Sequence, residues 1–166
     1  MILVTLGTQK FQMNRLIKAV DAIAETLKEE VFVQTGNSSY TPCNCKHQAF
    51  VDKDEFKQMI ENCSLLITHS GVGSIMTGIR AKKPIIVVPR MKLYKEHVDD
   101  HQAEIAQAFS EKGCVLCCTD LSKLGEVIQQ AGSYSFQPYV EPEGKVEDII
   151  LSYIGGIHES RNHYNK

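Results

Sequence analysis

Short, continuously apolar runs alternate with segments of helical periodicity along this chain, and this alternation constrains the fold more than any other feature. Strands that are apolar along their whole length are buried on both faces, which is typical of parallel sheets covered by helices. The pattern predicts an α/β fold, a Rossmann-like parallel sheet with helices on both faces. The expected strands are Ile2–Leu6, Val31–Thr35, Ala49–Val51, Leu65–Thr68, Pro84–Pro89 and Cys114–Cys118.

The intervening segments place apolar residues at helical spacing, with charged residues on the other side. Asp54 is expected to cap the second helix. We expect a single domain over residues 1–156 and a polar, frayed tail over residues 157–166. The expected helices are Leu16–Leu27, Asp54–Cys63, Ser74–Lys82, Asp99–Lys112, Leu121–Ala131 and Val146–Ile154.

Composition narrows the class of protein. The chain has 166 residues with a formal net charge of −2, whereas nucleic-acid-binding domains are usually basic. Its start runs directly into an apolar strand without a basic region, and no apolar run approaches the roughly 18 residues that cross a bilayer. We therefore expect a cytoplasmic protein that reaches a membrane through a partner or a surface patch.

The six cysteines fit a reducing compartment. Most lie in apolar stretches and are expected to pack as small hydrophobic residues. The segment Cys43-Asn-Cys45-Lys-His47 has the residue types of a metal site but lacks a second ligand pair at suitable spacing. We expect no metal and no cofactor.

Two junctions between a strand and the following segment have the chemistry of a ligand site. In open parallel sheets, ligands bind beyond the carboxyl ends of the strands. The first junction is Leu6-Gly7-Thr8, and the second runs from His69 through Ser70-Gly71-Val-Gly73-Ser74 into a helix. Glycines and serines at a helix start offer free N–H groups, hydroxyls and the positive end of the helix dipole, which suits phosphate. The alternative is a structural turn with a serine cap.

The sequence does not match the spacing of other common nucleotide-binding motifs. Gly71, Gly73 and Gly78 do not form G-x-G-x-x-G, and no acidic residue ends the second strand, so a nicotinamide or flavin dinucleotide is not expected. The chain also lacks G-x-x-x-x-G-K-[ST], which argues against a P-loop NTPase.

A third polar cluster follows the fifth strand. It begins with three cations, Arg90, Lys92 and Lys95, whose charge can offset a diphosphate. Donors and acceptors suited to a hydroxyl-rich sugar follow: Glu96, His97, His101 and Gln102. The alternative is a solvated loop with an aspartate cap.

Together these segments resemble the C-terminal domain of family 28 glycosyltransferases, over roughly residues 1 to 130. The likeness rests on Val4–Thr8, on Ile67–Ser74 through Lys83–Pro89, and on Glu96–Gln102. It is strongest to stand-alone subunits of this family, which act in the eukaryotic dolichol pathway and in bacterial capsule or exopolysaccharide synthesis. The resemblance implies one half of a GT-B fold.

The resemblance also implies roles for particular residues. Gly7 and Thr8 are expected to line the diphosphate side of the cleft, and Phe50 and Val51 to hold uracil through backbone groups. The segment from Ser70 to Ser74, with Gly71 and Gly73, is expected to cradle the diphosphate. His101 and Gln102 match the pair that touches the donor hexose. Many relatives place a glutamate on the ribose where this chain has Thr77.

The implied activity is transfer of a hexose from UDP-GlcNAc, UDP-Gal or UDP-Glc, with inversion, to a lipid-pyrophosphate-linked acceptor. A separate membrane-anchored subunit is expected to supply the other GT-B half. The candidate bases are His69, Glu96 and His97, unless the partner supplies the base. The alternative is a non-catalytic nucleotide-sugar-binding subunit that activates a partner enzyme. An epimerase of this architecture carries both halves on one longer chain.

Overall fold

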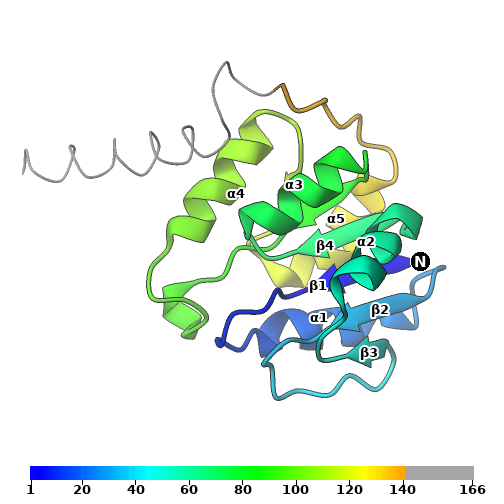
Figure 1. Cartoon of the computed structure of the whole chain (residues 1–166), viewed down its shortest axis with the longest axis vertical. Coiled ribbons are helices and arrows are strands. Elements are labelled where there is room, and N and C mark those ends of the chain that lie inside the picture. Colours follow the sequence, from blue (N-terminus) through cyan, green and yellow to red (C-terminus); the bar gives the residue numbers. More distant parts are fainter. Residues whose placement is uncertain (141–166) are drawn as a thin grey trace, which may run out of the picture.

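The computed structural model describes residues 1–140, whose strands form a single parallel sheet (Figure 1). The order of the six strands is β3-β2-β1-β4-β5-β6. All five neighbouring pairs are parallel. The strands are β1 (Ile2–Thr5), β2 (Val31–Gln34), β3 (Lys46–Gln48), β4 (Leu65–Thr68), β5 (Ile85–Val87) and β6 (Leu116–Cys117).

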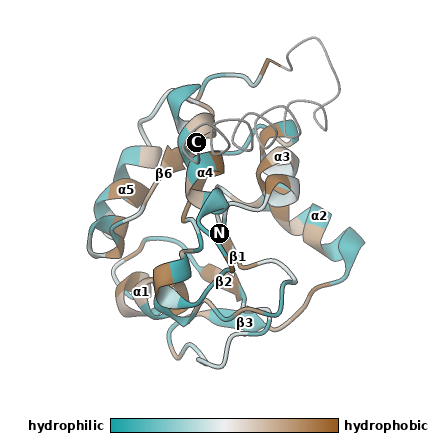
Figure 2. Ribbon diagram, turned by 90° about the vertical axis from the view of Figure 1, so that its left-hand side faces the viewer, coloured by the Kyte–Doolittle hydropathy of each residue, from teal (hydrophilic) through white to brown (hydrophobic). Residues whose placement is uncertain are grey.

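Helices cover both faces of the sheet, as the apolar strands require (Figure 2). Neighbouring residues of β1 point to opposite faces. Val4 packs in the core beside Leu16 of α1, whereas Leu3 packs in a second core beside Ile60 of α2. The helices are α1 (Asn14–Ala24), α2 (Lys53–Asn62), α3 (Val72–Arg80), α4 (His101–Glu111) and α5 (Leu124–Ala131), with 3₁₀ turns η1 (Lys92–Tyr94) and η2 (Leu121–Lys123).

The strand order reverses between β1 and β4. After β1 the chain builds β2 and β3 on one side, and it then crosses to build β4, β5 and β6 on the other. Connections that leave in opposite directions open a crevice at the carboxyl ends of the two central strands. This crevice lies where the first two polar junctions, at Gly7 and at His69–Ser74, leave the sheet.

The predicted fold is confirmed, but the edge strand was predicted wrongly. Ala49–Val51 is not a strand, and β3 is the preceding segment Lys46–Gln48, whose three residues are all exposed. Its backbone pairs with β2, and Lys46 forms an ion pair with Glu30. An edge strand packs on one neighbour only, so its residues need not be apolar, and apolarity was a poor guide there.

The helix starts also differ from prediction by a few residues, and at α2 and α4 the physical reason is clear. Asp52, not Asp54, caps α2, since its carboxylate accepts hydrogen bonds from the backbone N–H groups of Asp54 and Glu55. Helix α4 begins at His101, because residues 92–100 form the 3₁₀ turn and a loop. The expected helix Val146–Ile154 and the tail over residues 157–166 lie outside the described residues. Within residues 1–140, no helix is both long and apolar enough to span a membrane.

Candidate functional site

Two glycine turns and a histidine meet at the carboxyl ends of β1 and β4. Gly7, at the end of β1, has φ +70°, a conformation that glycine adopts without strain. The buried His69 ring follows β4 and lies against both Gly7 and Gly71. A Cβ added at Gly7 would lie 2.5 Å from Cε1 of His69, and one at Gly71 would clash with Nε2. Both glycines therefore make room for the imidazole.

The environment of His69 keeps its ring neutral. Burial lowers its pKa, and the positive charge of Arg90 adds to the effect, so that the pKa is about 4. A neutral imidazole can donate or accept one hydrogen bond beside an anion, but a group with this pKa is a weak general base at neutral pH.

Ser70 offers a hydroxyl without a partner inside the protein. It is 1% exposed, and its Oγ has no hydrogen-bond partner within the described part of the chain. Buried hydroxyls are rarely left unpaired, and such an exception often marks a ligand or ion. Ser70 directly precedes Gly71, the N-cap of α3.

The N-terminus of α3 is free to meet a ligand. No side chain caps it, so its first N–H groups point outward without an acceptor from a cap. Gly73, in the first turn, is exposed, and a Cβ added there would meet nothing within 4 Å. The turn combines free donors, a positive dipole end and open space, which together suit an anion.

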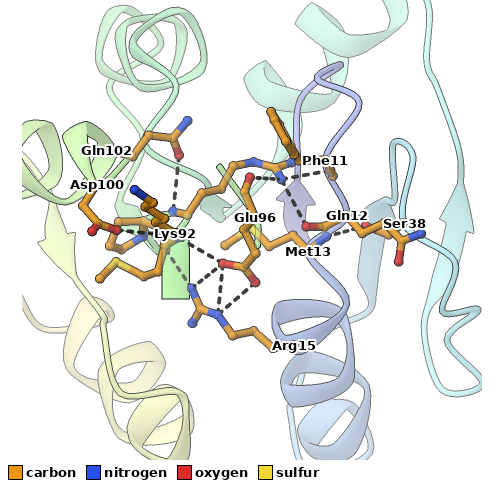
Figure 3. Close-up of polar contacts among 12 residues, drawn as sticks. Phe11, Gln12, Met13, Arg15, Ser38, Lys92, Glu96, Asp100 and Gln102 are labelled. Carbon is orange, nitrogen blue, oxygen red and sulfur yellow. Dashed lines mark hydrogen bonds and ion pairs between the residues drawn. The ribbon is translucent and has the colours of Figure 1, made fainter. Parts of the chain in front are cut away.

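The cations of the third cluster occupy two different places. Lys92 and Lys95 are exposed, whereas Arg90 is 1% exposed beneath the loops. Its guanidinium donates to the carbonyl of Leu6 (2.7 Å) and to that of Phe11 (2.9 Å), the latter labelled in Figure 3. Arg90 thus ties the loop after β5 to the loop after β1, a role that the sequence-based interpretation as a diphosphate-facing cation did not anticipate.

Glu96 has a similar bracing role. Its carboxylate is buried and accepts from Nε (3.0 Å) and Nη2 (2.9 Å) of Arg15 in α1, as Figure 3 shows. It also accepts from the backbone N–H of Met91. A carboxylate held by a bidentate guanidinium is a poor proton acceptor. Sequence reasoning missed Arg15, because nothing in its local pattern marks a partner 81 residues away.

His97 is held as catalytic histidines often are. Its Nδ1 lies 2.9 Å from Oδ1 of Asp99, and its ring lies 5.8 Å from that of Phe11. Burial raises the pKa of Asp99, but hydrogen bonds from the His101 backbone and from His97 outweigh it and lower the pKa. A carboxylate on one ring nitrogen fixes the orientation of the imidazole and supports a proton acceptor at the other.

The two expected sugar residues stand at the start of α4. Gln102 is buried, and its Oε1 accepts from the Arg90 backbone N–H (3.3 Å). His101 is 39% exposed and faces the carboxylates of Glu104 (3.1 Å) and Asp99 (3.7 Å). Arg90 therefore links Gln102 to the turn after β1, through its backbone N–H on one side and its guanidinium on the Leu6 carbonyl on the other.

Comparison with known families decides the assignment. The chain matches the family described as glycosyltransferase family 28 C-terminal domain over residues 1–146. The chain belongs to this family. The structure is accordingly an α/β, Rossmann-like half of the GT-B fold.

Individual relatives agree with this family 28 assignment. The human UDP-N-acetylglucosamine transferase subunit ALG13 is 30% identical over 129 residues, which are 71% of this chain and 11% of that protein. A second relative, from Prochlorococcus marinus, is 33% identical over 82 residues, which are 47% of this chain and 22% of that protein. It is a UDP-N-acetylglucosamine--N-acetylmuramyl-(pentapeptide) pyrophosphoryl-undecaprenol N-acetylglucosamine transferase. The chain spans only about a tenth of the first curated relatives.

A solved structure shows the same fold in an independent chain of similar size. The solution structure of ALG13 superposes with a TM-score of 0.56 at 18% identity, covering 84% of this chain and 89% of that one. At this level of identity the likeness concerns the fold alone.

The remaining family 28 positions lie at the same sheet edge. Phe50 is 46% exposed and Val51 half-buried, directly after β3. Two strands separate β3 from β4, so these residues lie about 14 Å across the edge from the α3 turn. Thr77, which the resemblance placed where many relatives have a glutamate, donates its hydroxyl to the Gly73 carbonyl (2.7 Å).

Proposed function

We propose that this family 28 domain binds a UDP-sugar and transfers its hexose to a lipid-pyrophosphate-linked acceptor, together with a membrane-anchored partner that supplies the other GT-B half. The pathway is polysaccharide or glycolipid synthesis. The observation that carries the proposal is the unpaired buried hydroxyl of Ser70 at the uncapped N-terminus of α3. Such a turn stabilises the charge that develops on a leaving diphosphate.

The donor is placed along the carboxyl edge. Its diphosphate lies between Gly7–Thr8 and the segment Ser70–Ser74, and its uracil lies over the backbone of Phe50 and Val51. Its hexose faces His101 and Gln102. The relatives named above favour UDP-GlcNAc among UDP-GlcNAc, UDP-Gal and UDP-Glc, since both are named for the transfer of N-acetylglucosamine. Arg90 contributes positive charge from beneath the turn.

The reaction is a displacement with inversion. The acceptor hydroxyl oxygen forms a bond to the anomeric carbon, while the bond from that carbon to the β-phosphate oxygen breaks and its electron pair leaves with UDP. The hydroxyl proton passes to a general base. Of the three candidates, Glu96 is engaged by Arg15 and His69 has a low pKa, so His97, backed by Asp99, is the favoured base on this chain.

Binding of UDP to Ser70→Ala tests the diphosphate site. Because the hydroxyl has no partner inside the protein, its loss should leave folding unchanged but weaken UDP binding by roughly tenfold in calorimetry. Ser110→Ala, in the last turns of α4 and away from the carboxyl edge, is the matched control. Equal UDP affinity of Ser70→Ala and the unchanged chain would refute the site.

Transfer assays test whether the chain needs a partner subunit for activity. The chain alone and the chain with a co-expressed partner would be supplied with radiolabelled UDP-GlcNAc and a lipid-pyrophosphate-linked acceptor. We expect product only with the partner, and a loss of at least a hundredfold with His97→Gln. Full activity of the lone chain would contradict the split enzyme, and full activity of His97→Gln would place the base on the partner.

A further inference from the structure

The loop between β5 and α4 exposes apolar side chains that the nucleotide site does not use. We name residues 92–98 the 92–98 loop. In it, Leu93 is 80% exposed, Val98 64% and Tyr94 54%, whereas the charged Glu96 between them is 3% exposed. This is the reverse of the usual distribution, in which charged groups face water and large apolar ones do not. Neighbouring exposed apolar residues of this kind mark an interaction surface.

The exposure is imposed by a braced backbone. The 3₁₀ turn is closed by hydrogen bonds from Tyr94 N–H to the Met91 carbonyl and from Lys95 N–H to the Lys92 carbonyl. Lys95 then adopts the left-handed conformation, with φ +58°. Beneath the turn, Glu96 is fixed by Arg15. The loop therefore holds Leu93 and Val98 outward instead of letting them fold onto the core.

Cations surround the exposed apolar side chains. Lys92 and Lys95 are exposed within the loop, and Lys10 lies across a cavity of about 550 Å³ whose lining also includes Phe11 and Tyr94. The nearby acids are engaged by the protein itself. Glu96 pairs with Arg15, Asp99 faces His97, and Asp100 accepts from the Lys92 backbone N–H (2.8 Å).

We propose that the 92–98 loop is a membrane contact that inserts Leu93 and Val98 shallowly into the headgroup region of an anionic bilayer, with the lysines on lipid phosphates. Apolar side chains flanked by lysines suit this interface, because the long lysine stems keep their charge at headgroup level. Lysine is depleted in protein–protein interfaces, which favours lipid over a protein partner. The contact would hold the carboxyl edge of the sheet against the surface in which a lipid-linked acceptor resides.

Vesicle flotation tests the contact directly. The chain would be mixed with vesicles of phosphatidylcholine alone, or of phosphatidylcholine with phosphatidylglycerol. We expect binding to the anionic vesicles, weakened by roughly tenfold or more in the double variant Leu93→Ser/Val98→Ser. Lys92→Gln should weaken it by about fivefold. Val140→Ser, which removes a side chain that is 78% exposed outside the loop, should leave binding unchanged.

Several outcomes would overturn the proposal. These are no binding to anionic vesicles, equal binding to neutral ones, or equal binding by the double variant. If the double variant instead loses a co-expressed partner subunit while vesicle binding is unchanged, the loop is a protein-docking surface. UDP affinity measured on the double variant should equal that of the unchanged chain, which separates failure of the membrane contact from failure of the nucleotide site.

Discussion

The buried His69 ring should make the stability of the protein depend on pH. Its folded pKa of about 4 lies below the ordinary value of 6.5, so the unfolded chain binds the proton more readily. Stability from this group is present above pH 6.5 and is lost as the pH falls towards 4. The shift corresponds to roughly 3 kcal/mol. Urea unfolding at pH 7 and at pH 4 should show a smaller difference in His69→Asn than in the unchanged chain.

Carboxylates also titrate in acid and change the stability of both proteins. The effect of His69 is therefore the difference in pH dependence between His69→Asn and the unchanged chain. His47→Asn is the control, because that histidine is exposed on the edge strand. An unchanged pH dependence in His69→Asn would show that the ring is not held neutral by burial.

The two glycines of the α3 turn should respond oppositely to alanine. At Gly71 a Cβ clashes with His69, so Gly71→Ala should lower stability by about 1–3 kcal/mol. At Gly73 the space is open, so Gly73→Ala should fold normally and even gain up to about 1 kcal/mol as a better helix former. The same methyl group occupies space proposed for the diphosphate, so UDP affinity should fall. Thermal unfolding and calorimetry with UDP measure both effects, and unchanged UDP affinity of Gly73→Ala would argue against the placement.

The sequence predicted the roles of residues whose interactions are local, but not the roles of residues whose partners lie far away along the chain. The glycines and Ser70 could be identified because their chemistry lies within one strand–turn–helix segment. The roles of Arg90 and Glu96 could not, because they depend on the Leu6 and Phe11 carbonyls and on Arg15, which lie 79 to 84 residues away along the chain. A charged residue in a polar loop looks the same whether it faces solvent or braces a neighbouring loop.

At the scale of elements, Asp52 should contribute more to the stability of α2 than Asp54 does. Its Oδ1 accepts from the backbone N–H groups of Asp54 (3.0 Å) and Glu55 (2.9 Å). Asp52→Ala should therefore cost about 1 kcal/mol, and Asp52→Asn much less, since asparagine also caps helices. Asp54→Ala, the residue that the sequence pattern favoured as the cap, is the comparison. Chemical denaturation measures all three, and an equal cost at both positions would contradict the assignment.

The ion pair between Arg15 and Glu96 should hold α1 and the loop after β5 together. Removing one partner of a buried pair leaves the other uncompensated, so Glu96→Gln should lower stability by roughly 2–4 kcal/mol. Arg15→Met should cost more, because it leaves the Glu96 carboxylate, whose side chain is 4% exposed, without its partner, whereas Glu96→Gln leaves an Arg15 side chain that is 19% exposed. In the double variant the two costs should not add. Strictly additive costs would show that the pair is not coupled.

Element types were more predictable than their ends. The central strands could be predicted because burial on both faces leaves an apolar run. Strand β3 was predicted at the wrong place, because its exposed Lys-His-Gln sequence gives no such signal. Helix α4 starts at His101 and not at Asp99, because the 3₁₀ turn at Lys92–Tyr94 and the loop after it come first, and the sequence gives no sign that the Glu96 carboxylate in this loop is buried against Arg15.

At the scale of the whole molecule, the strand order determines where chemistry can occur. Polar turns after β1, β4 and β5 become neighbours only because these strands are adjacent in the sheet. The alternation of strands and helices predicted the parallel sheet, which is confirmed, and the rule that ligands bind at its carboxyl edge indicated where to place the candidate site. Neither predicted that Arg90 would lie beneath that edge, since its position depends on carbonyls of the loop after β1 and on Gln102 of α4.

Ligand binding at that edge should stabilise the whole domain, because a folded crevice binds UDP and an unfolded chain does not. At a hundredfold excess over the dissociation constant, the gain is about 2.7 kcal/mol. For a domain of this length, such a gain corresponds to a rise in Tm of about 5–11 °C. UDP and UDP-GlcNAc should both raise the Tm, whereas NAD should not, since the chain lacks a dinucleotide fingerprint. Ser70→Ala should reduce the rise without changing the Tm of the free protein. A rise with NAD and none with UDP would mean that the turn at α3 serves a different nucleotide, and the transferase assignment of this chain would lose its donor.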